Sequence, residues 1–215
     1  KPPGVLLGLT RDQKQAVEHE AGPALILAGP GSGKTRTLTA KIAHLILKKK
    51  IPPDSILALT FTNKAAREIK GRLENSLGNR AGRTCISTFH ALGYSLLQTC
   101  RRDLGRSRKF TLIDENERIK VLVNICHIKS KEAGRAAATI MELKQNGTEP
   151  EKTSRTAEEI RLFYAYEKAL KEADVFDIDD CIFQPLQLFS RHPEIRDQFR
   201  RRFQWILVDE YQDIN

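Results

Sequence analysis

The chain has 215 residues, a length that predicts one large domain, or one domain carrying an insertion, with a substantial buried core. Its formal net charge of +9 and its sequence pI of about 9.5 favour a polyanionic partner. No apolar run is long enough to span a bilayer and no signal-like segment opens the chain, which argues against a membrane-bound or secreted protein. The four cysteines show neither paired nor zinc-site spacing, and this favours a reducing, cytoplasmic location.

A short helix is predicted directly after Thr10, because a threonine side chain can cap the first turn of a helix. Gln13 lies in that first turn, upstream of a glycine-rich segment. Its side-chain amide both donates and accepts hydrogen bonds, and it therefore suits the edge of an adenine base. The alternative interpretation is an ordinary surface glutamine.

The glycine-rich segment is the strongest single motif. An apolar run at residues 24–28 predicts a buried strand that leads into the turn Gly29-Pro30-Gly31-Ser32-Gly33. All three glycines are expected to take positive φ angles, at which backbone N–H groups turn inward and cradle phosphates. Lys34 then offers a positive charge to the β- and γ-phosphates, and Thr35 offers a hydroxyl to Mg²⁺. The segment predicts ATP and Mg²⁺ as ligands, although Ala28 replaces the first glycine of the general phosphate-loop pattern.

The next strand-to-helix turn carries candidate nucleic-acid contacts. Apolar residues recur at helical spacing over residues 35–47, and residues 56–60 predict a second buried strand. That strand runs into a set of side chains that suits base stacking and phosphate contact: Phe61, Thr62, Asn63 and Lys64. The alternative interpretation places Phe61 in the core and Lys64 in solvent.

A third strand is predicted at residues 84–87, followed by a helix over residues 91–100. Between them, His90 is a candidate for contact with a phosphate or sugar, and the alternative is a purely structural histidine. The basic stretch that follows is a candidate phosphate track: Arg101, Arg102, Arg106, Arg108 and Lys109.

The alternation of strands and helices lapses between residues 110 and 190, where four amphipathic segments predict a helical insertion. The segments cover residues near 119–126, 136–144, 157–171 and 181–189. Asp177, Asp179 and Asp180 precede the last of them. We interpret Asp179 and Asp180 as helix-capping residues in preference to a metal cluster, because they lie where the helix begins.

A fourth buried strand, residues 205–208, delivers the acidic pair Asp209 and Glu210. In a chain with a phosphate loop, such a pair places one carboxylate on Mg²⁺ and the next near the attacking water. Asp209 is therefore predicted to hold the metal with Thr35, Glu210 to act as general base, and Gln212 to sense the γ-phosphate. Combined with the glycine-rich segment, this pair predicts an ATPase.

In their order and form these motifs resemble those of the superfamily 1A DNA helicases of the UvrD/Rep/PcrA type. Five segments agree: around Gln13, residues 28–38, residues 59–66, residues 88–90 and residues 208–215. The resemblance implies a RecA-like P-loop NTPase domain with a parallel sheet. Residues 1–108 and 199–215 would form its domain 1A, and residues 109–198 the helical insertion 1B. The second RecA-like domain is absent from this chain, which we expect to be a piece of a longer protein.

The resemblance also assigns residues to ligands. It implies nucleotide contacts from Gln13, from the glycine-rich turn with Lys34 and Thr35, and from Arg36. It implies contacts to single-stranded DNA from Phe61, Thr62, Asn63, Lys64 and His90. Two departures are Thr10, where the family has asparagine, and the segment 177–181, which differs from the family's Asp-Phe-Asp-Asp-Leu at Ile178 and Cys181.

The implied activity is that of a 3′→5′ ATP-driven translocase that unwinds duplex DNA, with single-stranded DNA and duplex/single-strand junctions as partners and DNA repair and replication as settings. Alternatives are the motor half of a helicase–nuclease, and a translocase that strips DNA-bound proteins without productive unwinding. The family's catalytic arginines lie beyond this chain, and such a residue contributes about 10³–10⁵ in rate. We therefore expect the chain alone to bind nucleotide but to turn it over very slowly.

Overall fold

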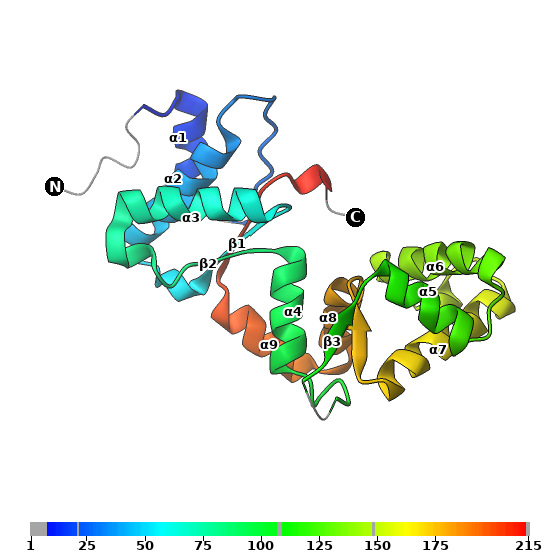
Figure 1. The fold of residues 1–215 in the computed structure, drawn as a ribbon. Helices are drawn as coiled ribbons and strands as arrows, with labels where there is room; N and C mark the ends of the chain where they lie inside the picture. Colours follow the sequence, from blue (N-terminus) through cyan, green and yellow to red (C-terminus); the bar gives the residue numbers. More distant parts are fainter. Residues whose placement is uncertain (1–7, 21, 107–108, 148, 214–215) are drawn as a thin grey trace. The chain divides into compact units, whose positions relative to one another are not determined.

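The computed structural model describes residues 8–20, 22–106, 109–147 and 149–213. The chain divides into two compact units: unit 1, residues 1–88 and 198–214, and unit 2, residues 89–197. Both units combine helices with parallel strands, which confirms the α/β class and the parallel sheet of the predicted fold (Figure 1). Among the described residues, no helix is both long and apolar enough to cross a membrane.

Unit 1 contains a three-stranded parallel sheet in the order β2–β1–β5 (Figure 1). β1 is Ile56–Thr60, β2 is Cys85–Thr88 and β5 is Trp205–Val208. In the register, Leu57 of β1 lies opposite Cys85 on one side and Ile206 on the other. β1 is buried along its whole length, as expected of a central parallel strand. These three strands were predicted and are confirmed.

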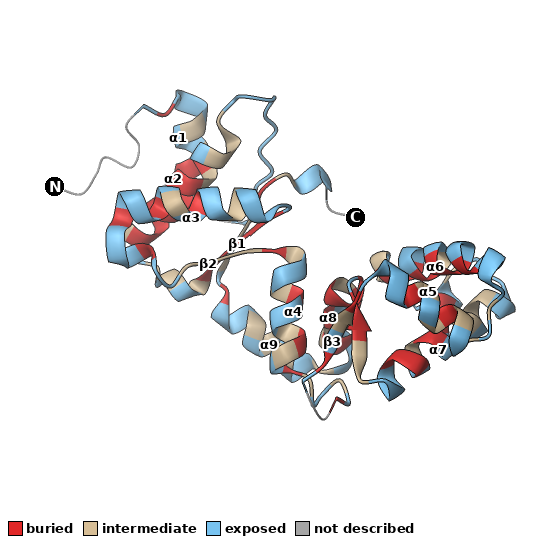
Figure 2. Cartoon of the chain, in the orientation of Figure 1, coloured by how far each residue is buried: buried red, intermediate tan, exposed pale blue. Residues whose placement is uncertain are grey.

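Three helices of unit 1 are α1, Arg11–Glu18, α2, Lys34–Leu47, and α3, Asn63–Leu77, and single 3₁₀ turns lie at Pro53–Ser55, Gly78–Ala81 and Tyr211–Asp213. α1 begins where predicted, because Thr10 and Gln13 form a capping box in which each side chain accepts the other's backbone N–H. α2 and α3 share a buried apolar core with β1, seen along α2 and β1 in Figure 2, which includes Ile42, Leu45, Ile56, Ile69 and Leu73.

The strand predicted at residues 24–28 does not form, so that prediction was wrong. The segment has no regular secondary structure, and Leu25, Ile26 and Leu27 expose 67%, 53% and 87% of their surface. An apolar run becomes a strand only where it packs beside another strand, and within the described residues the sheet ends at β5. The run is part of the exposed loop that leads to α2 (Figure 2).

Unit 2 is built mainly from helices: α4, Phe89–Thr99, α5, Glu115–Asn124, α6, Ser130–Gln145, α7, Ala157–Glu172, and α8, Asp180–Arg191. A 3₁₀ turn lies at Pro150–Lys152, and α9, Pro193–Arg202, crosses the boundary between residues 197 and 198. Two strands that the sequence did not predict, β3, Thr111–Ile113, and β4, Val175–Asp177, pair in parallel. Each is three residues long, too short to show a strand periodicity.

α4 packs closely on α8 at Gly93. A Cβ atom built on Gly93 would lie 2.6 Å from the carbonyl carbon of Cys181, and closer still to its oxygen. Only a glycine therefore allows this approach of the two helices. Because of this contact α4 belongs to unit 2, so unit 1 ends at residue 88. The predicted first part of domain 1A ends at residue 108 instead. The domain assignment itself stays a prediction.

A cluster of buried charges lies in the core of unit 2. Lys144 is fully buried, and its Nζ lies 2.9 Å from Asp177 Oδ2 and 2.7 Å from Asp180 Oδ1. Arg118 pairs with Asp179 and lies 3.5 Å from Asp177. Buried carboxylates of this kind are tolerated because they are paired with cations.

The aspartates of this cluster correct one prediction. Asp179 is the residue before α8, but its side chain makes no capping hydrogen bond, because it is paired with Arg118. Asp177 and Asp180 instead bond each other's backbone, with each N–H donating to the other carboxylate at 2.9–3.0 Å. Capping by Asp179 was therefore wrong. Among the described residues, no group of three or more His, Cys, Asp or Glu side chains is placed to hold a metal ion.

Arg106 corrects another prediction, since it does not belong to an exposed phosphate track. It is buried, donates to the carbonyl oxygens of Leu170 and Val175 at 3.0 Å, and lies 4.3 Å from the centre of the Phe176 ring. A buried guanidinium satisfied by carbonyls and a ring is a packing element. Arg108 of the same predicted track lies outside the described residues.

Candidate functional site

The glycine-rich loop, residues 29–33, joins the exposed apolar run to α2. Gly31 and Gly33 have φ angles of +72° and +85°, as expected, and Gly33 is the N-cap residue of α2. Gly29 does not have a positive φ, so this part of the prediction was wrong. The reason is Pro30, because a residue before proline is held toward extended backbone. The Gly29 carbonyl instead accepts a hydrogen bond from Ser32 N at 3.3 Å, which closes a tight turn.

The N-terminus of α2 has the properties of an anion site. No side chain caps this end of the helix. The first N–H groups of a helix have no acceptor within it, and the helix dipole adds partial positive charge there. The space beside Gly31 is also open, since a Cβ on it would meet no described atom within 4 Å. The loop and helix end together fit a phosphate group.

Two side chains at the start of α2 meet two carboxylates at the end of β5. Lys34 Nζ lies 3.8 Å from Glu210 Oε1, and it donates to the carbonyl oxygens of Ala28 and Gly29 at 3.3 and 3.4 Å. The Thr35 hydroxyl lies close enough to the Asp209 carboxyl to lower its pKa. These groups are far apart in the sequence and meet because α2 packs on the sheet that contains β1 and β5, with which it shares one apolar core.

Asp209 is the buried member of the acidic pair. Its backbone N–H donates to Leu59 O at 2.8 Å, so the strand ladder continues through it and fixes its direction. Burial raises the pKa of the Asp209 carboxyl, the negative charge of Glu210 adds to the rise, and Lys34 and Thr35 oppose it. A cation beside Asp209 would relieve this cost, which suits the metal-holding role predicted for it.

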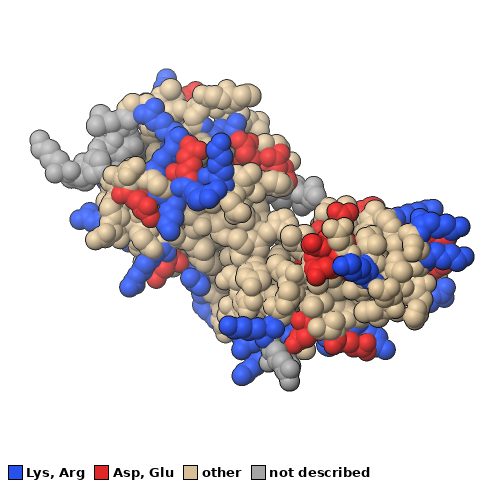
Figure 3. Space-filling model, viewed as in Figure 1, with Lys and Arg blue, Asp and Glu red and all other residues tan. Residues whose placement is uncertain are grey.

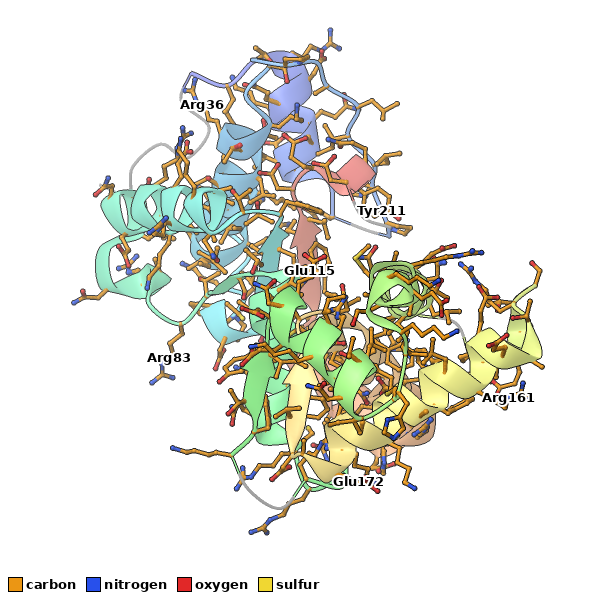
Figure 4. The ribbon with its side chains drawn as sticks, turned by 45° about the vertical axis from the view of Figure 1, so that its right-hand side comes forward. Arg36, Arg83, Glu115, Arg161, Glu172 and Tyr211 are labelled. Carbon is orange, nitrogen blue, oxygen red and sulfur yellow. The ribbon has the colours of Figure 1, made fainter. Side chains whose placement is uncertain are left out.

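Glu210 is held in an uncommon backbone conformation between two partners. Its φ angle is +52°, in the left-handed region that residues with a side chain seldom adopt. Gln212 Nε2 donates to Glu210 Oε2 at 2.6 Å, while Lys34 approaches the other carboxylate oxygen. Backbone strain of this kind is concentrated at functional sites. Tyr211, between them in sequence, is exposed (Figure 4).

Gln13 contacts the glycine-rich loop from α1. Its Nε2 donates to Ser32 O at 2.8 Å, and its Oε1 accepts from Thr10 N at 3.0 Å. A Cβ on Gly33 would lie 2.9 Å from the same Nε2, so the amide lies against the loop. The contact ties α1 to the loop across 19 positions of sequence. The adenine contact predicted for Gln13 stays a prediction.

The candidate DNA-contact residues of unit 1 follow β1. Phe61 exposes 52% of its surface, so the alternative that placed it in the core was wrong. Thr62 caps α3 by accepting the Ala65 N–H at 3.1 Å, and Asn63 and Lys64 are exposed in the first turn. β1 and β5 are parallel, so this group and the acidic pair lie at the same edge of the sheet, where open α/β sheets bind ligands.

The two remaining candidates are His90 and Arg36. His90 is exposed in the first turn of α4, in unit 2, and Arg36 lies in the first turn of α2 (Figure 4). On the face drawn in Figure 3, Lys and Arg side chains are interspersed with Asp and Glu. The sequence missed the role of the Ala28 carbonyl as an acceptor for Lys34. No sequence signal could have shown it, since every residue carries a carbonyl.

Comparisons with known proteins find relatives over nearly the whole chain. Residues 9–215 match the family described as UvrD/REP helicase N-terminal domain. The chain is 40% identical over 222 aligned residues to the ATP-dependent DNA helicase PcrA of Bacillus subtilis, which covers 98% of this chain and 30% of the relative. It is 37% and 36% identical over 218 residues to the PcrA proteins of Staphylococcus epidermidis and Staphylococcus aureus, covering 96% of this chain and 30% of each relative. The chain thus spans about 30% of the length of these relatives.

Proposed function

The chain belongs to the UvrD/REP helicase family, and on that premise we propose that it is the ATP-binding N-terminal portion of an ATP-dependent DNA helicase. The proposed activity is 3′→5′ translocation on single-stranded DNA with unwinding of duplex. The observation that carries the proposal is the meeting of Lys34 and Thr35 with Glu210 and Asp209. Lys34 and Thr35 begin α2, and Asp209 and Glu210 follow β5, so the packing of α2 on the sheet brings together a phosphate-binding segment and an acidic pair from distant parts of the sequence.

The proposed domain assignment follows the same premise. Residues 1–108 and 199–215 would form the RecA-like domain 1A, and residues 109–198 the helical insertion 1B. The parallel sheet of unit 1 and the succession of α5, α6, α7 and α8 in unit 2 support it. The four cysteines are free thiols, which supports the proposed cytoplasmic location.

Residues of the loop and of β5 would hold the nucleotide and the metal. The backbone N–H groups of Gly29, Gly31, Ser32 and Gly33 and the Lys34 ammonium would bind the phosphates, with Pro30 shaping the turn. Thr35 and Asp209 would hold Mg²⁺. When bound, Mg²⁺ neutralises charge on the phosphates. Lys34 would then contact phosphate oxygens in place of the Glu210 carboxylate. Glu210, released from Lys34, would be available as the general base.

Glu210 would accept the proton of the attacking water. A general base of this kind contributes about 10²–10⁴ in rate. Gln212 would orient the Glu210 carboxylate, since the Gln212 amide already donates to Glu210 Oε2 at 2.6 Å. Gln13 and Arg36 would contact the nucleotide, and the Gln13 amide keeps one N–H donor and one oxygen lone pair for adenine beside its bonds to Ser32 and Thr10.

The proposed DNA contacts divide into stacking and backbone contacts. Phe61 has the exposed ring that base stacking requires. Thr62, Asn63, Lys64 and His90 would contact phosphate and sugar, which position a strand without reading its sequence.

The test is Mg²⁺-dependent ATP turnover by the parent protein, with and without single-stranded DNA, beside Glu210→Gln. We expect strong stimulation by DNA and a loss of about 10²–10⁴ in the variant, with nucleotide binding kept. Glu172→Gln, an exposed position on α7, is the matched control and should behave like the unaltered protein. The 215-residue chain alone should turn over ATP very slowly. Turnover that is indifferent to DNA would refute the motor.

A further inference from the structure

A cavity lies in unit 1, at the end of α2 opposite to the glycine-rich loop. Its volume is about 160 Å³, and its polar and aromatic lining is His19, Glu20, Lys41, His44, Lys49 and Trp205. The lining therefore comes from the residues directly after α1, from the second half of α2 and the residues after it, and from the start of β5. None of the residues assigned above to nucleotide or DNA is among them.

His44 is the unexplained group in this cavity. It exposes only 9% of its surface, and neither ring nitrogen has a hydrogen-bond partner among the described residues. Buried polar groups in folded proteins are nearly always satisfied, because leaving them unpaired forfeits their hydration. His44 lines the cavity, and both of its ring nitrogens are buried without a partner among the described residues, so a ligand in the cavity that reached the ring would satisfy them.

The charges around the cavity show what would bind. Lys41 is buried, donates to Val17 O at 2.9 Å and to His19 O, and lies 4.9 Å from the centre of the Trp205 ring. Its partners are therefore dipoles and a ring, and it has no ion pair among the described residues. Lys49 does have one, with Glu20, which is well exposed.

We propose that this cavity binds a small oxyanion of the sulfate or phosphate class, with His44 as hydrogen-bond donor and Lys41 and Lys49 as the positive charges. The volume excludes a nucleotide, since sites for drug-sized ligands occupy about 300–1,000 Å³. It accommodates an oxyanion with a few waters, each of which takes about 30 Å³. The site is independent of the proposed ATPase function.

Binding in this site is expected to depend on pH. Burial lowers the pKa of His44, the charges of Lys41 and Lys49 lower it further, and Glu18 and Glu20 oppose them. An anion beside the ring would favour the protonated form, so binding takes up a proton. Affinity should therefore rise as pH falls, by up to about tenfold per pH unit.

The test uses fluorescence, because Trp205 is the single tryptophan of the 215-residue chain and lines the cavity. Sodium sulfate would be titrated against sodium chloride at equal ionic strength, at about pH 6 and about pH 7.5, a range in which sulfate keeps its charge while histidine titrates. We expect a saturable change in Trp205 emission that is tighter at the lower pH. Inorganic phosphate should compete with sulfate.

Variants separate this site from other anion sites. His44→Leu should abolish the saturable change, and Lys49→Gln should weaken it several-fold. Lys34→Ala, at the glycine-rich loop, and Lys70→Gln, exposed on α3, should leave it intact. His19→Gln should keep the pH dependence, since the proposal assigns that dependence to His44.

Three results would overturn the proposal: no saturable change at either pH, a change that persists in His44→Leu, or a change that disappears in Lys34→Ala. If circular dichroism shows that His44→Leu does not fold, Lys49→Gln decides, because its side chain is partly exposed and its replacement should not disturb the core. An unchanged affinity in folded Lys49→Gln would then refute the site.

Discussion

The substitution Gly93→Ala tests the contact between α4 and α8. The new Cβ would lie 2.6 Å from the carbonyl carbon of Cys181. Carbon atoms in contact prefer about 3.5–4.0 Å, and the carbonyl oxygen would lie closer still, so the two helices would have to separate by more than about 1 Å. The obstacle is backbone within α8, which has no rotamer to change. The variant therefore loses packing along the whole contact.

The expected size follows from two opposing effects. Replacing a mid-helix glycine with alanine gains about 1 kcal/mol from helix propensity. Overpacking in a dense core costs about 1–3 kcal/mol and sometimes more, and a clash with a rigid carbonyl belongs at the upper end. We expect a net loss of about 2 kcal/mol or more in the free energy of unfolding.

Gly134→Ala is the matched control, because Gly134 also lies within a helix of unit 2, α6, but a Cβ there would meet no described atom within 4 Å. It should stabilise the chain by about 0.5–1 kcal/mol. Urea unfolding followed by far-ultraviolet circular dichroism would measure both midpoints. Equal shifts of the two variants in the same direction would refute the close approach of α4 and α8.

Three further predictions concern other parts of the molecule. Burial raises the pKa of Asp180 to about 7, although the charge of Lys144 opposes the rise. Below that pH the folded state therefore holds a proton that the unfolded state has already released above about pH 4, and above it Asp180 is the carboxylate paired with Lys144. Stability should fall as pH rises from about 4 to about 7, by up to about 1.4 kcal/mol per unit, and Asp180→Asn should flatten the slope in urea titrations. Gln13→Ala removes the capping box and the bond to Ser32 and should lower the unfolding free energy by about 1–2 kcal/mol, whereas Gln15→Ala on the exposed face should change it little. Phe61→Ala should weaken binding of single-stranded DNA to the parent protein by about 1–3 kcal/mol; unaltered affinity in fluorescence anisotropy would rule out stacking.

The features that the sequence predicted well have local causes. Thr10 and Gln13 are three residues apart, and the capping box that they form needs nothing beyond one turn of helix. β1 is a continuous apolar run bounded by turn residues, and it is buried along its whole length. The start of α2 at Lys34 likewise follows from Gly33, which takes the left-handed conformation that ends the loop.

The features that it missed depend on distant partners. Lys144 lies 33 positions from Asp177, and no local spacing distinguishes a lysine destined for a buried ion cluster from one in solvent. Arg106 shows the same limit, since its carbonyl acceptors lie 64 and 69 positions away. The run at residues 24–28 is a feature that the sequence predicted but the structure lacks. Its apolar composition suits a strand, but a strand also needs a neighbouring strand to pair with.

The acidic pair was predicted from its place after an apolar strand, but its conformation was not. The positive φ of Glu210 and the bond from Gln212 are set by how the chain leaves the sheet. A glycine at this position would have indicated a positive φ angle, but a glutamate does not.

The outer side of β5 has a further consequence. Within the described residues, β5 pairs with β1 alone, and Ile206 on it is exposed. An unpaired edge strand presents a row of backbone N–H donors and carbonyl acceptors. Any extended peptide can pair with them, since backbone hydrogen bonds do not depend on which side chains are present. Concentrated solutions of the 215-residue chain should therefore self-associate by indiscriminate strand addition, and a short capping peptide or a charged residue at Ile206 should restore solubility.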